Sequence, residues 1–182
     1  RMAISHSGAF SLGAGTNYQF IPELNLGIIV LTNGAPVGAA EAVAAEFMDI
    51  VQYRETPRDW VSDAAGFFAP YTAPSGDLVD ETRPTNPSEP PALDTLAGTY
   101  ESDYFGTMIV ENVGGALRGK LGPTANVILD FENWDGSTFE YSPTSESAPA
   151  GSKASAVFAE DGSSVVLTSF DAQGLGTWKH VS

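Results

Sequence analysis

The sequence predicts an α+β part, made of antiparallel strands and a helix, followed by an all-β part of eight antiparallel strands. Three observations lead to this fold class. A strand hairpin and an amphipathic helix lie near the start, a Pro- and Ser-rich stretch follows, and short strands with glycine turns fill the second half. We therefore expect three parts, over residues 1–53, 54–91 and 92–182.

The first part combines a hairpin with a helix. Residues 15–22 and Leu26–Thr32 are rich in β-branched and aromatic residues, which predicts two strands with a turn between them. Leu26–Thr32 is a continuous apolar run, typical of a strand buried on both faces. An amphipathic helix is predicted by apolar residues at spacings of three and four: Ala40, Val43, Phe47 and Ile50. Because one helix cannot cover both faces of a sheet, we expect this part to be the tail of a larger α/β domain.

The connecting part, residues 54–91, begins with a predicted short helix. Thr56 suits the N-cap, Pro57 the first helical position and Asp59 the first turn. The helix itself is indicated by residues at helical spacing: Trp60, Ala64, Phe67 and Tyr71. Residues 72–91 contain many prolines, which disfavour regular structure, so they are expected to form an extended linker.

The third part contains eight short strand candidates separated by turn signals such as Gly114-Gly115 and Asp161-Gly162. Evenly spaced short strands with glycine turns predict an up-and-down antiparallel barrel or sandwich. A closed barrel of eight strands is either filled by side chains or holds one small ligand. We expect a filled interior, with a core that includes Val110, Leu129, Phe139, Val157, Phe158, Val166, Leu167 and Trp178.

Composition excludes several function classes. The net charge of −15 and the pI near 4.2 argue against binding nucleic acid or an anionic membrane through a basic face. The chain has no Cys, which excludes thiol nucleophiles, disulfides and zinc-thiolate sites. Its two His residues are far apart, at His6 and His180, and give no metal signature, so no metal or cofactor is expected. No apolar stretch reaches the length of a membrane span.

The opening of the chain carries a family resemblance. The stretch HSGAFSLGAGTNYQFIPELNLGIIVLTNG, followed by an Ala-rich helix, resembles the end of the serine β-lactamase and penicillin-binding-protein-like hydrolases, in their class C-like, esterase branch. In this family an inner strand of the catalytic cleft carries a third conserved motif, Lys-Thr-Gly, which is often His-Ser-Gly or His-x-Gly in the esterase-like members. The resemblance implies that His6, Ser7 and Gly8 occupy this third motif. It also implies that the main-chain N–H of Ala9 is one of two oxyanion-hole donors. Residues 92–182 resemble the lipocalin-like β domain that is appended to many of these hydrolases.

The family's nucleophile motif, Ser-x-x-Lys, is absent. The residues three before the lysines Lys120, Lys153 and Lys179 are Leu, Ala and Gly. We therefore expect the chain to be the C-terminal fragment of a serine hydrolase whose longer parent, periplasmic or secreted, cleaves an ester, amide or β-lactam through an acyl-enzyme. The compartment of the chain itself stays open. The expected partner is the missing N-terminal catalytic portion or a second copy of the chain.

Two other functions stay open at this point. The barrel could be a binding module for a small apolar ligand. It could also be a structural domain that gates the catalytic cleft or mediates oligomerisation. An interior filled with large side chains favours the structural role over ligand binding.

Overall fold

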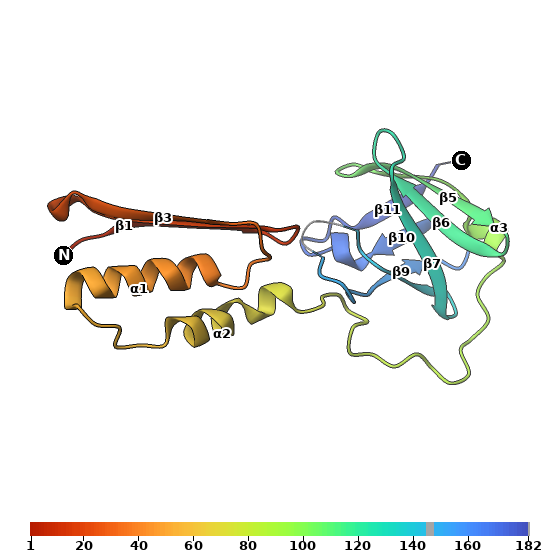
Figure 1. The fold of residues 1–182 in the computed structure, drawn as a ribbon. Coiled ribbons are helices and arrows are strands. Elements are labelled where there is room, and N and C mark those ends of the chain that lie inside the picture. The colour runs from red at the N-terminus through yellow and green to blue at the C-terminus, as the bar shows by residue number, and fades with distance from the viewer. Residues whose placement is uncertain (145–147, 182) are drawn as a thin grey trace. The chain divides into compact units, whose positions relative to one another are not determined.

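The computed structural model describes residues 1–144 and 148–181, and Figure 1 shows their fold. The chain divides into two compact units, Arg1–Ala73 and Pro74–Ser182. The predicted domain limits at residues 53 and 91 stay predictions. Within the described residues, no helix combines the length and the apolar character needed to cross a membrane.

The first unit is a three-stranded antiparallel sheet with two helices. The strands β1 (Ile4–Phe10), β2 (Ala14–Ile21) and β3 (Leu26–Thr32) pair in the order β1-β2-β3. A short 3-10 turn at Pro22–Leu24 joins β2 to β3, and Asn25 closes it in the left-handed region. The predicted hairpin is thus present, and α1 (Ala39–Tyr53) and α2 (Trp60–Thr72) follow on one side of the sheet.

The strand β3 alternates between its two faces. Leu26, Ile28 and Val30 are half-buried on the side of α1, which packs on β2 and β3. Ile29 and Leu31 point the other way and are 74% and 72% exposed. In this unit β3 is therefore covered on one face only.

The face of α1 that is buried differs from the predicted one. Ala40 is buried as expected and Phe47 is half-buried, but Val43 and Ile50 are about half exposed. The buried side chains of α1 are Ala40, Ala42, Ala44, Met48 and Asp49. The predicted helix is thus present, and α1 packs against α2 as well as the sheet, so small residues on a second side are also covered.

The start of α2 lies later than predicted. Asp59, not Thr56, is the N-cap, and Trp60 is the first helical residue. The Asp59 carboxylate accepts hydrogen bonds from the Ser62 main-chain N–H at 3.1 Å and from the Ser62 hydroxyl at 2.7 Å. These bonds lower the pKa of Asp59, because they stabilise its ionised form.

The second unit is a closed barrel of eight antiparallel strands. Every strand pairs with its neighbours in sequence, and the last strand closes on the first. This result decides between the predicted barrel and sandwich in favour of the barrel. Its strands are β4 (Gly98–Ser102), β5 (Gly106–Val113), β6 (Ala116–Leu121), β7 (Val127–Asp135), β8 (Thr138–Tyr141), β9 (Ala154–Phe158), β10 (Ser164–Leu167) and β11 (Thr177–His180), with α3 at Leu93–Leu96 and a 3-10 turn at Thr168–Phe170.

Side chains fill the barrel. The predicted core residues Val110, Leu129, Phe139, Phe158, Leu167 and Trp178 are all buried. Val157 and Val166, however, pair with each other on the outer face, so their placement in the core was wrong. Val165 takes the inner position opposite Phe158.

The segment before the barrel lies along it as a strap, which we define as residues 74–91. The Lys153 N–H donates to Ser75 O at 3.0 Å, and the Leu78 N–H donates to Lys153 O at 3.2 Å. Farther along, the Gly136 N–H donates to Ser88 O at 3.0 Å. The strap has no helix or strand, as predicted for a linker, but its main chain is bonded to the barrel.

A carboxylate anchors the strap. Asp77 accepts hydrogen bonds from the Ser155 hydroxyl at 2.6 Å, the Ser155 N–H at 2.9 Å and the Thr168 hydroxyl at 2.6 Å. Partial burial by itself raises the pKa of Asp77. The hydrogen bonds from Ser155 and Thr168 outweigh that effect and hold the pKa below its usual value.

Candidate functional site

The strand β1 carries all four residues that the family resemblance singled out: His6, Ser7, Gly8 and Ala9. β1 is an edge strand, so alternate main-chain N–H and C=O groups of β1 point away from β2. Because successive side chains of a strand alternate, His6 and Ser7 lie on opposite faces of the sheet. The structure thus brings the four residues onto one strand but divides their side chains between two environments.

His6 lies on the face that the helices leave bare. It is in register with Tyr18 of β2, and the two rings stack with centroids 6.3 Å apart. Tyr18 in turn is paired with Ile29 of β3. The exposed apolar and aromatic residues of this bare face are Ile4, Phe10, Tyr18, Phe20, Ile29 and Leu31.

Ser7 lies on the face covered by the helices. Its hydroxyl donates a hydrogen bond to the carboxylate of Glu41, which is in the first turn of α1. Sequence analysis did not single out Glu41, because 34 residues separate it from Ser7 and only the fold brings them together. This contact gives the Ser7 hydroxyl a fixed acceptor on α1.

Gly8 and Ala9 take part in the contacts of β1 with β2 through their main chain. The Thr16 hydroxyl of β2 donates to Gly8 O at 3.1 Å. Ala9 pairs with Gly15 in the register of the two strands. The oxyanion-hole role of the Ala9 N–H stays a prediction, as do the roles of His6, Ser7 and Gly8.

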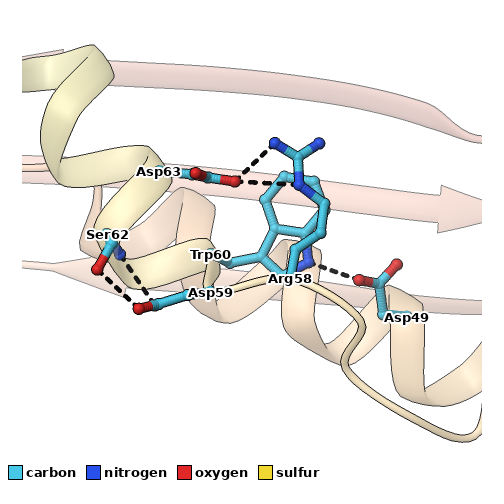
Figure 2. Close-up of polar contacts among 6 residues, drawn as sticks. All are labelled: Asp49, Arg58, Asp59, Trp60, Ser62 and Asp63. Carbon is cyan, nitrogen blue, oxygen red and sulfur yellow. Dashed lines mark hydrogen bonds and ion pairs between the residues drawn. The ribbon is translucent and has the colours of Figure 1, made fainter.

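A second polar cluster lies at the start of α2, and Figure 2 shows it. The Arg58 guanidinium stacks on the Trp60 ring, 4.5 Å from its centroid, and its Nη2 lies 2.6 Å from Asp63 Oδ2. The Trp60 indole Nε1–H donates to Asp49 Oδ2 at 2.5 Å. Asp49 is buried in α1, so this bond ties the beginning of α2 to α1.

Sequence analysis noted Trp60 only as part of a helix face. The sequence gives little indication of this cluster. Arg58 precedes α2 and Asp63 lies in its first turn, so the five-residue spacing is not the regular spacing of a pair within one helix. The cluster fixes a cation, an indole and a carboxylate in one place beside the covered face of the sheet.

The described residues give no sign of a metal centre. Across residues 1–144 and 148–181, no three His, Asp or Glu side chains lie close enough together to hold a metal ion. The buried residues of the second unit are mainly apolar and aromatic, which is the composition of a packed core.

A solved structure is similar to part of the chain. No protein-family model and no curated protein sequence matches the chain. Among solved structures, the crystal structure of the C-terminal domain of penicillin-binding protein Rv0907 is similar, with 36% sequence identity and a TM-score of 0.50. The similarity covers 95% of that domain and 55% of this chain, which is more residues than the first unit contains, so it extends into the second unit. The chain therefore contains a domain of the penicillin-binding-protein C-terminal type and belongs to that family.

Proposed function

We propose that this chain is the C-terminal part of a serine β-lactamase or penicillin-binding-protein-like hydrolase of the class C-like, esterase branch. In the complete enzyme, a serine in a separate portion would attack an ester, amide or β-lactam, and the acyl-enzyme would be hydrolysed. The similarity to a penicillin-binding-protein domain supports this assignment.

The bare face of the three-stranded sheet is the observation that carries the proposal. Exposing a large apolar side chain instead of burying it forgoes about 1.5–3 kcal/mol. The bare face carries six such residues, including Ile29 and Leu31, and both outer strands of the sheet have an unpaired edge. We propose that the N-terminal catalytic portion packs on this face and continues the sheet.

Within that complete enzyme, β1 would form one wall of the catalytic cleft. His6 points to the face on which the catalytic portion would pack. Gly8 and Ala9 lie on an edge strand, where main-chain N–H groups are available to an oxyanion. Ser7 points to the other face and would reach the cleft only around the edge of β1.

The barrel would serve as a lipocalin-like appended domain. Its interior is filled by aromatic and branched side chains, including the fully buried Trp178, Tyr100 and Phe131. A filled interior supports a structural role, in gating the cleft or in assembly, over the alternative of an internal site for an apolar ligand.

Fluorescent penicillin tests the proposal in two settings. The chain alone should remain unlabelled, because it contains no Ser-x-x-Lys. The native protein, labelled in source cells and captured with an antibody against the barrel, should be labelled and heavier than 19.1 kDa. A captured protein labelled neither by fluorescent penicillin nor by an active-site serine probe would contradict the hydrolase assignment. Labelling of the chain alone that is lost in Ser7→Ala would make Ser7 a nucleophile and overturn the fragment interpretation.

Docking on the bare face has its own test. The chain should bind an apolar dye or self-associate at micromolar concentration, and Ile29→Lys combined with Leu31→Lys should reduce both. A monomer that binds no dye would show that the bare face needs no partner. The matched control is Val61→Lys, which changes an exposed apolar residue on α2 and should leave both measurements unchanged.

A further inference from the structure

The first unit has an open hollow of about 490 Å³ between the covered face of the sheet and α2. This volume lies within the range of about 300–1,000 Å³ that is typical of small-molecule sites. Side chains of β1, β2, α1, α2 and the segment before α2 line it. The apolar part of the lining consists of Ala42, Ala45, Trp60, Ala64, Phe67 and Phe68.

Asn17 is the unusual member of the lining. Its side chain is only 7% exposed, and its Oδ1 atom has no hydrogen-bond partner among the described residues. Buried polar groups in folded proteins are nearly always hydrogen-bonded, and an unpaired one destabilises the fold. Its neighbour across the strands, Ser7, does not pair with it, because the Ser7 hydroxyl donates to Glu41. The Oδ1 atom of Asn17 therefore has a free acceptor position among the described residues.

Gln19 gives the hollow a second carboxamide. It is two residues from Asn17 on β2, so both side chains point to the same face. Both line the hollow. A carboxamide offers two donors and an acceptor with two lone pairs, so it pairs well with another amide.

The charges around the hollow select against an anion. Glu41 and Asp63 both line it, and Arg58 is its cation. The Arg58 guanidinium already forms an ion pair with Asp63 and stacks on Trp60, so its charge is neutralised within the protein. A ligand carboxylate would therefore meet Glu41 without a free cation to offset the repulsion.

We propose that this hollow is a binding site for a neutral, peptide-like ligand. The amide group of the ligand pairs with the carboxamides of Asn17 and Gln19, and its apolar side chain packs against Phe67 and Phe68. The site lies on the sheet face opposite His6 and shares only Ser7 with the proposed cleft wall, so ligand binding there does not require the hydrolase function.

Titration with N-acetyl-L-phenylalaninamide, followed by two-dimensional NMR of the 182-residue chain, tests the proposal. A ligand of this size in a formed pocket is expected to bind with a dissociation constant on the order of a millimolar. The signals that shift should include the side-chain amides of Asn17 and Gln19 and the indole N–H of Trp60. N-acetyl-L-phenylalanine, which has a carboxylate in place of the amide, should bind about tenfold more weakly.

Two substitutions identify the site. Asn17→Leu keeps the side-chain size and removes the amide, so it should weaken binding about tenfold. Gln19→Leu should also weaken binding. It keeps the test decisive if Asn17→Leu fails to fold. Tyr18→Phe is the matched control, because Tyr18 lies between them on the opposite face of β2, and it should bind like the parent chain.

Three results would overturn the proposal. The first is no shift of these signals with several millimolar amide. The second is equal binding of the amide and the acid. The third is unchanged binding in both Asn17→Leu and Gln19→Leu, which would place the probe elsewhere, for example on the bare face.

Discussion

Gly76 lies in the strap of the second unit, where it crosses the start of β9. Its φ is +120°, and an added Cβ would lie 2.1 Å from the main-chain oxygen of Lys153. That oxygen also accepts the Leu78 N–H, and the Lys153 N–H donates to Ser75 O. Because main chain stands on both sides of the contact, Gly76→Ala can be accommodated only if the strap leaves the barrel.

The loss of stability follows from these contacts. Two main-chain hydrogen bonds contribute about 0.5–1.5 kcal/mol each. Re-exposure of Leu78, which is 7% exposed, removes about 1.5–3 kcal/mol. The released residues regain some conformational entropy, which offsets part of this loss. We expect the free energy of unfolding to fall by about 3 kcal/mol in Gly76→Ala.

Gly174→Ala is the matched control. Gly174 also has a positive φ, +73°, but nothing lies within 4 Å of its added Cβ. It should lose only the strain of a left-handed residue, about 1–2 kcal/mol.

Thermal unfolding followed by tryptophan fluorescence measures both variants. In a Trp60→Phe background, the remaining tryptophans, Trp134 and Trp178, both report on the second unit. A loss of 1 kcal/mol lowers Tm by about 4–8 °C in a unit of this size. Gly76→Ala should therefore melt at least about 12 °C below the parent, and well below Gly174→Ala. Equal Tm values for the two variants would refute the claim that the strap is fixed by this contact.

Three further predictions concern the barrel unit. Burial, together with a nearby carboxylate, raises the pKa of Tyr100 to about 12. The stability that Tyr100 contributes should thus be complete below about pH 10 and disappear as the pH rises through about 12, as guanidinium unfolding of the parent and of Tyr100→Phe at several pH values will show. The pKa of Asp77 is lowered, so its contribution should be present above its ordinary pKa of 3.8 and disappear as the pH falls through the lower folded value. Asp77→Asn should therefore be less stable than the parent near neutral pH, with the difference shrinking in acid, as guanidinium unfolding at several pH values will show. Val165→Ala should lose about 2 kcal/mol and Val166→Ala less than about 0.5 kcal/mol in the same assay, because only Val165 points into the core.

The barrel could be predicted from the sequence because local signals define it. Strand candidates and glycine turns alternate along residues 93–182, and each strand pairs with the next one. Adjacent valines mark the limit of this reasoning. In β10, Val165 and Val166 are equally apolar, and only the pairing of Val165 with Phe158 decides which of them points inward.

The covered face of the first unit could not be predicted in the same way. Ser7 meets Glu41, and Trp60 meets Asp49, through contacts between elements that are not neighbours in the sequence. The unpaired Oδ1 atom of Asn17 has no sequence signal, because it depends on which side chains of the described residues fail to reach it. The alternation of side chains along a strand does predict that Asn17 and Gln19 lie next to each other on one face of β2.

The strands β1 and β2 place mostly polar side chains under the helices, apart from the buried Ile21, whereas β3 places Leu26, Ile28 and Val30 there. Over β1 and β2, the covered face carries the polar side chains of Ser5, Ser7, Asn17 and Gln19, while aromatic and branched residues occupy the bare face. A unit that worked alone would place its apolar residues under the helices. The arrangement over β1 and β2 is consistent with two separate uses, a partner on the bare face and a polar ligand on the covered face. Substitutions distinguish them, since Ile29→Lys should change association but not binding of the amide probe, and Gln19→Leu should do the reverse. A substitution that changed both measurements would mean that the two faces respond together and that neither proposal describes an independent site.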